Sequence, residues 1–356
     1  MSEAPDKFAS PGAFRMALAL SVFLHHTTSY NIGMSAVLIF FVLSGYWVAT
    51  MWAATYSKTR SPYLTFVVSR CWRIIPVFAL CSGITWALLY WRGEHPAQIG
   101  GLAHQIFSNL FIIGYNTLPY QANVPGWSLD MELQFYLIAP LVIFLISKSI
   151  HVLAVFVLTT VLSQWLGGAA TVAPFIIFFA IGVASAVYDL KPSRALAYRT
   201  LFATLALLVI FAALFIKNIA LGELQGKDLV ALSSTSNLLV AVMMTPFALY
   251  TVRQRSGWVD RMFGDLTYIF YLMHWPIIGL NQTGEGSYWN RLWLCSESLL
   301  VILAASFVIW RVFDHPINKW RAAWVKSRML PSAALEARAR GETAGAWREG
   351  RNRLHS

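Results

Sequence analysis

Charged residues are scarce in this sequence. Asp, Glu, Lys and Arg make up only 12% of the 356 residues, whereas apolar residues make up 57% and the mean hydropathy is +0.57. A water-soluble globular domain rarely has such a balance, because it must cover its surface with polar groups. The composition therefore excludes an ordinary soluble enzyme and predicts an all-α, polytopic membrane helix bundle.

Cysteine is also scarce, and the three residues are Cys71, Cys81 and Cys295. They show neither paired spacing nor a metal-ligand pattern with histidine, which argues against a disulfide framework and a metal site. We expect them to fill space in the core. The amino terminus lacks a basic region followed by a cleavage site of small residues, so we expect no signal peptide to be removed.

Acidic residues are few as well, 16 against 27 Lys and Arg, which gives a formal charge of +11. The basic residues are scattered between apolar runs and fit orientation in a bilayer better than nucleic-acid binding. The apolar run from Ile106 to Gly114 is too short to cross a membrane and is expected to be interfacial or re-entrant. With about twenty apolar residues for each crossing, the sequence predicts ten spans, near 13–30, 33–55, 74–91, 131–147, 149–166, 172–189, 200–216, 229–250, 264–281 and 292–313.

The positive-inside rule fixes an orientation for these spans. With a cytoplasmic amino terminus, only four of the 27 Lys and Arg residues fall on the opposite side, namely Arg92, Lys217, Lys227 and Arg291. We therefore expect both termini in the cytoplasm and a multi-pass protein of the cell inner membrane. Residues 1–330 would form the membrane domain, and residues 331–356 a charged cytoplasmic tail that is helical or disordered.

Two apolar runs between Phe14 and Thr50 contain polar residues that are costly inside a membrane. Arg15 and His26 are separated by ten residues, so on a helix they project from nearly the same face, about 16 Å apart along the axis. Ionisable side chains in a span usually face the bundle interior and mark a site or pathway. The alternative is that Arg15 reaches the membrane surface while His26 makes one buried hydrogen bond.

A second feature is the pair Arg70 and Arg73 at the cytoplasmic start of the predicted third span. At positions i and i+3 the two side chains lie on neighbouring faces of a helix. Two guanidinium groups there could hold phosphates, because each offers a planar fork of donors that stays charged. For this pair taken alone, ordinary positive-inside anchoring is the simpler explanation.

A third feature is Glu132, which enters a span from the non-cytoplasmic side. Asp130 comes just before it, and Trp127 and Tyr136 lie on either side. The carboxylate could orient a sugar hydroxyl, take up a proton or pair with a cation in the membrane. The aromatic residues suit a carbohydrate, although Trp and Tyr are common at any membrane interface.

A fourth feature is His274, which lies within the predicted ninth span and is followed by Trp275 and Pro276. It could line a catalytic cavity or satisfy backbone groups freed by the proline. Gly264 and Tyr268 on the same segment are expected to be packing residues.

These four stretches together resemble the acyltransferase-3 family of bacterial integral-membrane O-acyltransferases, which modify polysaccharides, lipopolysaccharide and other envelope glycans. Asp130 stands where that family more often has a small or aliphatic residue, and we expect none of the soluble esterase-like domain that some relatives carry. The matching pieces are Arg15 with ten residues before His26, the run Phe40 to Gly45, the pair Arg70 and Arg73, Trp127 to Glu132, and Tyr271 to Pro276.

The resemblance implies transfer of an acyl group, usually acetyl, from cytoplasmic acyl-coenzyme A to a hydroxyl of a glycan or lipid-linked saccharide. It implies no permanently bound cofactor and no metal, and the partners would be acyl-CoA, the acceptor and membrane lipids. His26 and Glu132 would be catalytic, and the acyl-CoA would be bound by Arg15, Arg70 and Arg73. The substrate cavity would be lined by His25, Ser44, Trp127, Asp130, Tyr136 and His274.

His26 could act as a general base or become acylated and relay the group, and the sequence leaves both routes open. A different reading is a secondary transporter or exporter of a glycan or lipid-linked precursor, in which the intramembrane charges form a proton or substrate path. A third is a non-catalytic scaffold of an envelope-assembly complex. The absence of a visible internal repeat argues against the transporter.

Overall fold

A computed structural model of the chain describes residues 9–28, 31–94, 101–167, 170–221, 227–281, 287–332 and 334. Within these residues the protein is built of helices and has no strand, which confirms the predicted all-α class. Most of the predicted tail, residues 331–356, lies outside the described part of the chain. The α-helices are α1 (Pro11–Thr27), α2 (Gly33–Ala54), α3 (Pro62–Trp91), α4 (Leu102–Phe111), α5 (Gly126–Lys148), α6 (Val152–Trp165), α7 (Ile176–Val187), α8 (Arg194–Leu221), α9 (Lys227–Thr251), α10 (Trp258–Leu280), α11 (Tyr288–Ile309) and α12 (His315–Ser327).

Each of the ten predicted spans overlaps one of these helices, but not all of the helices have the length and composition of a span. Four of the ten predicted spans fall on helices that do not. Helices α1, α6 and α7 have 17, 14 and 12 residues, and α10 is interrupted by polar residues such as Asp265 and His274. The count of ten spans and the cytoplasmic termini therefore stay predictions. Six segments are long and apolar enough to cross a membrane: Gly33–Lys58, Pro62–Trp91, Gly126–Lys148, Arg194–Phe215, Val230–Thr251 and Trp289–Ser327.

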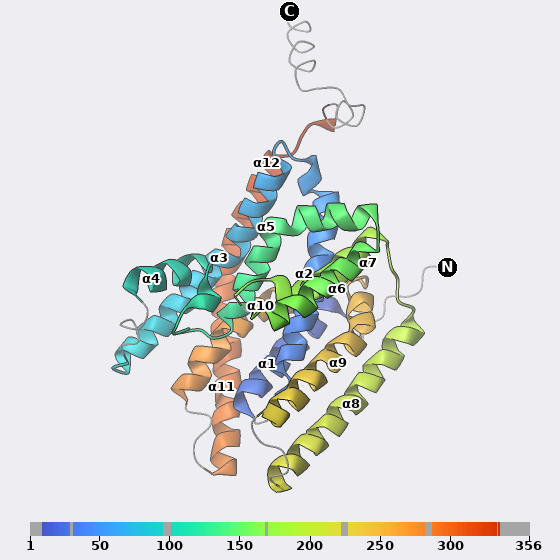
Figure 1. The fold of residues 1–356 in the computed structure, drawn as a ribbon. Coiled ribbons are helices and arrows are strands. Elements are labelled where there is room, and N and C mark those ends of the chain that lie inside the picture. Colours follow the sequence, from blue (N-terminus) through green and yellow to red (C-terminus); the bar gives the residue numbers. More distant parts are fainter. Residues whose placement is uncertain are drawn as a thin grey trace, which may run out of the picture.

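Helix α2 lies at the centre of the bundle and packs against α1, α5, α7 and α9 (Figure 1). Its contact with α7 is unusually close, because two glycines face it. A Cβ atom at Gly45 would lie 2.0 Å from the Phe179 carbonyl oxygen, and one at Gly182 would lie 1.9 Å from the Val42 carbonyl oxygen. Small residues allow such backbone approach between membrane helices, where dispersion contacts drive association. Ser44 precedes Gly45, so this close contact fixes the position of Ser44 relative to the neighbouring helices.

Helix α1 is fixed against α10 at their amino-terminal ends. Asp260 on α10 accepts a hydrogen bond from the Ala13 backbone N–H of α1 at 2.9 Å. A helix begins with backbone N–H groups that lack partners in the helix, so the carboxylate acts as a cap supplied by another helix. A Cβ atom at Gly12 would lie 1.8 Å from the Asp260 carbonyl oxygen. This crossing positions Arg15, one turn further along α1.

Helix α11 continues through a π-helical segment, η5 (Trp310–Asp314), into α12, which packs against α3. In Figure 1 helices α3 and α12 lie side by side at the top of the bundle.

Helix α4 covers most of the run from Ile106 to Gly114 that was expected to be interfacial or re-entrant. Ile106, Phe107 and Leu110 on α4 are exposed, whereas Gln105 and Asn109 are buried. This arrangement fits a helix whose apolar face meets lipid.

Candidate active site

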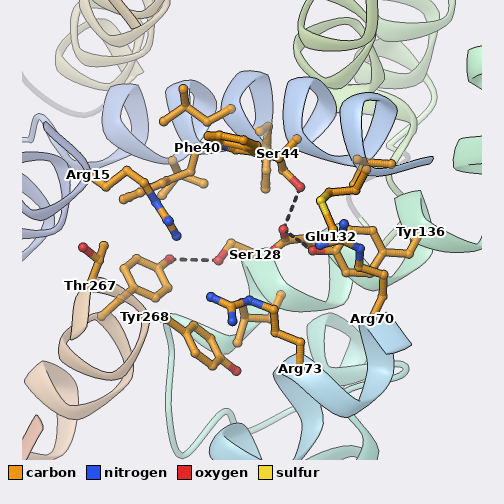
Figure 2. Close-up of a pocket in the computed structure, with 18 of the residues that line it drawn as sticks. Arg15, Phe40, Ser44, Arg70, Arg73, Ser128, Glu132, Tyr136, Thr267 and Tyr268 are labelled. Carbon is orange, nitrogen blue, oxygen red and sulfur yellow. Dashed lines mark hydrogen bonds between the residues drawn. The ribbon is translucent and has the colours of Figure 1, made fainter. Parts of the chain in front are cut away.

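A cavity of about 340 Å³ lies between α1, α2, α3, α5, α10 and α12 (Figure 2). Four arginines and one carboxylate are among its lining residues, so its electrostatic character is positive and it favours an anionic ligand. Its polar lining residues are Arg15, Ser44, Tyr56, Arg70, Arg73, Ser128, Glu132, Tyr136, Thr267, Tyr268, Tyr271 and Arg321.

The cavity is elongated, because one face of α2 lines it from Val37 to Met51. The lining positions recur every three or four residues, as expected for one stripe of a helix. At 1.5 Å for each residue, fourteen steps correspond to about 21 Å. Such a length suits an extended ligand better than a compact one.

Glu132 on α5 is held in place by two hydroxyl groups. Its Oε1 atom accepts hydrogen bonds from Ser44 Oγ at 2.7 Å and from Tyr136 OH at 2.6 Å (Figure 2). Tyr136 lies one turn after Glu132 on the same helix, whereas Ser44 comes from α2. Among the described residues, no other group donates to the carboxylate, so Oε2 keeps its acceptor capacity. The carboxylate is thus oriented and can still accept a proton or a hydrogen bond.

Arg70 on α3 is buried without a counter-ion in the described part of the chain. The residue is only 9% exposed, and its guanidinium lies 5.6 Å from each of the ring centres of Tyr56, Phe66 and Tyr136. Its Nε atom is buried and has no hydrogen-bond partner there. Aromatic faces attract a cation, but they compensate a buried charge only in part. An anion in the cavity would supply the missing compensation.

Arg73, one turn after Arg70, has partners that Arg70 lacks. Its Nη2 lies 3.5 Å from Asp265 Oδ1 of α10, and its Nη1 donates to Asn318 Oδ1 of α12 at 3.3 Å. Arg15 reaches the same region from α1, and Figure 2 shows both guanidinium groups pointing into the cavity. Arg15 makes no ion pair or hydrogen bond with the described residues. The cavity therefore holds more positive charge than its own carboxylates neutralise.

Three histidines, His25, His26 and His274, form a second cluster near the carboxyl-terminal end of α1. His26 stacks on His274 of α10 with ring centres 5.3 Å apart, and Trp275 meets His26 edge-on at 5.0 Å. His25 lies 4.5 Å from His26, again between ring centres. His274 is fully buried. None of these residues lines the 340 Å³ cavity.

Tyr271 connects the cavity with the histidine cluster. It lines the cavity, and its ring lies 5.9 Å from the ring of His274, one turn along α10. Its hydroxyl is held by Ser128 Oγ of α5 at 2.9 Å. The two groups of predicted site residues are therefore neighbours, with Tyr271 between them.

Two residues that were predicted to line the cavity, Trp127 and Asp130, pack against other parts of the protein instead. Trp127 packs against the rings of Phe41 and Phe175. Asp130 is 1% exposed and accepts hydrogen bonds from the Asn116 backbone N–H at 3.0 Å and from Gln134 Nε2 at 3.1 Å. The bond to Asn116 anchors the segment between α4 and α5, and neither Trp127 nor Asp130 lines the cavity.

The cavity also contains residues that the sequence did not single out. Tyr268, expected to be a packing residue, lines the cavity and donates to the Ile74 carbonyl oxygen at 2.7 Å. Tyr56 and Arg321 come from segments to which no role was given. Tyr268 and Tyr271 lie one turn apart on α10, so the helical period around His274 was a signal that could have identified them.

A comparison with protein families identifies the family of the chain. A family model described as an acyltransferase domain matches residues 8–311. The chain belongs to the acyltransferase-3 family. It is therefore a multi-pass membrane acyltransferase, and the transporter and scaffold readings lose their support. No curated protein and no solved structure matches this acyltransferase. The matched region contains every predicted site residue but ends before α12.

Proposed function

We propose that this acyltransferase moves an acyl group, most simply acetyl, from cytoplasmic acyl-CoA to a hydroxyl of an envelope glycan or exported polysaccharide. The observation that carries the proposal is the buried Arg70, which lines a long cavity rich in arginine and lacks a counter-ion in the described residues. A buried cation of this kind is costly unless a ligand supplies the opposite charge. The phosphates of CoA are such a ligand.

The donor would lie along α2. Its phosphates would contact the arginines, since guanidinium groups bind phosphate oxygens through two parallel hydrogen bonds. The pantetheine arm separates the phosphates from the thioester by many bonds, and the elongated cavity has the shape to receive such a molecule. Arg15 and His26 are eleven positions apart on α1, about 16 Å along the axis. The thioester would therefore point toward the histidine cluster, past Tyr271.

His26 would supply the acid–base chemistry. In direct transfer, it takes the proton of the acceptor hydroxyl while the oxygen attacks the thioester carbonyl carbon. The carbon–sulfur bond breaks, and the proton returns to the leaving CoA thiolate. In a relay, a ring nitrogen of His26 attacks the carbonyl carbon, the carbon–sulfur bond breaks, and CoA leaves as the thiol with a proton from the imidazole. The acceptor oxygen then attacks the acyl-imidazole, the carbon–nitrogen bond breaks, and the hydroxyl proton returns to His26. Both routes give the same products, a glycan ester and free CoA.

Glu132 would act on the donor or acceptor rather than on His26, because Ser44 and Tyr136 hold its carboxylate inside the cavity. Its free acceptor capacity suits a hydroxyl or amide N–H of the bound substrate. No permanently bound cofactor is needed for this chemistry.

The test uses the purified full-length protein in lipid nanodiscs. Binding of acetyl-CoA is measured by calorimetry, and acceptor-dependent release of CoA thiol is measured with envelope glycan extracts. We expect His26→Ala to bind acetyl-CoA like wild type but to lose nearly all turnover. His151→Ala, a histidine exposed between α5 and α6, is the matched control and should retain both. Turnover that survives in His26→Ala would remove that residue from the chemistry.

A further inference from the structure

Helix α12 is an unexpected part of the cavity wall. It follows the π-helical segment η5 and lies beyond residue 311, where the family match ends. The chain after α12 is tied to the connection between α2 and α3. The Arg60 backbone N–H donates to the Arg328 carbonyl at 3.0 Å, and the Leu330 N–H donates to the Lys58 carbonyl at 3.0 Å. Helix α12 is thus held firmly against α3, and π-helical segments of this kind often occur at functional sites.

Arg321 on α12 lines the same cavity as Arg70 and Arg73. Its Nη1 atom donates to Ser69 Oγ at 3.0 Å, and its Nε atom donates to Asn318 Oδ1 at 3.2 Å. Both partners are neutral, and no carboxylate of the described residues lies within ion-pair distance of Arg321. Two of its guanidinium donor sites therefore fix its orientation, while its charge stays uncompensated.

The neighbours of Arg321 also hold the other two arginines of this group. Tyr56 stacks on the guanidinium of Arg70 and exchanges a hydrogen bond of 2.9 Å with Ser69, the partner of Arg321. Asn318 accepts from both Arg73 and Arg321, and its own amide donates to Asp314 at 2.8 Å. Arg321 lies close enough to Arg70 and Arg73 for its positive charge to be repelled by theirs. Tyr56, Ser69 and Asn318 thus form a frame that holds three positively charged side chains close together.

The charges within this frame are not equal. Arg73 is neutralised by Asp265, with which it forms an ion pair of 3.5 Å. Arg70 and Arg321 have no such partner in the described part of the protein. Two uncompensated guanidinium groups, one on α3 and one on α12, match a phosphate monoester or a diphosphate, which carries about two negative charges near neutral pH.

We infer that Arg321 is a phosphate-binding residue that acts together with Arg70, while Arg73 serves as a positioning residue held by Asp265 and Asn318. The inference rests on the proposed function, because it takes the phosphates to be those of acyl-CoA. The same chemistry occurs in an anionic lipid headgroup, so the experiment must distinguish the two sources. A phosphate between Arg70 and Arg321 would join α3 to α12.

The experiment measures binding of CoA to the full-length protein in phosphatidylcholine nanodiscs. Hydrogen bonds to charged groups contribute about 1.5–3 kcal/mol, so we expect Arg321→Ala to raise the Kd by about 10- to 150-fold. Lys319→Ala removes an exposed charge from the same helix and should change the Kd less than about twofold. Arg321→Lys keeps the charge but loses the fork, and should give an intermediate Kd.

The probe is then varied. S-acetylpantetheine, which lacks all of the phosphates, should bind wild type and Arg321→Ala equally. In nanodiscs that contain phosphatidylglycerol, the difference in CoA affinity should persist. If it disappears there, or if the variant loses bound phosphatidylglycerol while its CoA affinity is unchanged, the site is a lipid site and the inference is overturned.

The failure of this inference differs from the failure of the proposed function. If wild type binds no CoA, the proposed function fails. If wild type binds CoA and Arg321→Ala binds it equally well, only the role of Arg321 fails. Should Arg321→Ala not give a monodisperse protein, the pair Arg321→Lys and Arg321→Gln decides, since only the former should retain part of the affinity.

Discussion

The uncompensated charge of Arg70 gives a prediction in which stability and binding change in opposite directions. Arg70 is 9% exposed and surrounded by three rings, with no carboxylate partner in the described residues. Replacing a buried ion by an apolar side chain of similar volume is often neutral or stabilising. We therefore expect Arg70→Met to unfold, without ligand, at the same Tm as wild type or at a higher one.

The magnitudes follow from the contacts. Three cation–π contacts at about 0.5–2 kcal/mol each would be lost, about 1.5–6 kcal/mol in total, whereas an unpaired buried ion costs several kcal/mol. The two effects nearly cancel or favour methionine. For the donor, two charge-assisted hydrogen bonds from one guanidinium fork correspond to about 3–6 kcal/mol. Acyl-CoA binding should then weaken by about a hundred- to ten-thousandfold.

The assay is thermal unfolding of the full-length protein in nanodiscs, with and without acetyl-CoA. At a ligand concentration of about 100 times the Kd, wild type should gain about 2.7 kcal/mol, and Arg70→Met should gain almost nothing. Arg60→Met, at an exposed arginine just before α3, should behave like wild type. The reasoning is refuted if Arg70→Met unfolds well below wild type and still gains stability from acetyl-CoA.

Three further predictions concern packing, orientation of the carboxylate and the ion pair. Gly45→Val should prevent accumulation of folded protein, because any Cβ would collide with the α7 backbone. Gly279 has open space around it, so Gly279→Ala should fold normally. Equal expression of both variants would contradict the α2–α7 contact. Tyr136→Phe keeps the ring beside the cavity but removes one hydrogen bond to Glu132, so kcat should fall about tenfold with an unchanged Kd for acetyl-CoA; a changed Kd alone would refute the assignment. Asp265→Asn should raise the KM for the donor by severalfold through loss of the ion pair, and a donor KM equal to that of wild type would show that the pair positions nothing.

Local patterns in the sequence singled out several residues that line the cavity. The pair Arg70 and Arg73 lies one turn apart on one helix, so their common location followed from helical spacing. The family resemblance added Ser44, and Arg15 stood out because polar groups in apolar runs are rarely placed without a partner or a cavity. Glu132 stood out for the same reason. All five line one cavity in the structure.

Long-range packing decides the parts that the sequence could not predict. Ser44 and Glu132 are 88 positions apart, and only the packing of α2 against α5 brings them within hydrogen-bond distance. Arg321 lies beyond the last predicted span, where a basic residue has no local feature that separates it from ordinary surface charge. The path of α12 back along α3 gives it a place in the cavity.

The same limit applies to the helices. Apolar composition located α6 and α7 as predicted, but hydropathy does not show that they are only 14 and 12 residues long. Their ends depend on turns and on the close contact of α7 with α2, which a window average cannot resolve. Likewise, the sequence placed both Asp130 and Glu132 in the site, yet the two positions are about 200° apart around α5. Asp130 therefore contacts Asn116 and Gln134 and does not line the cavity.

The central claim, transfer of an acyl group to an envelope glycan, is tested most directly by the O-acyl content of those glycans. Mass spectrometry would compare cells that lack this chain with the same cells given wild type, His26→Ala or His151→Ala. We predict that an acetyl-sized mass disappears without the chain, returns with wild type and with His151→Ala, and stays absent with His26→Ala. Glycans whose masses are the same in all four strains, with the protein expressed, would contradict the account.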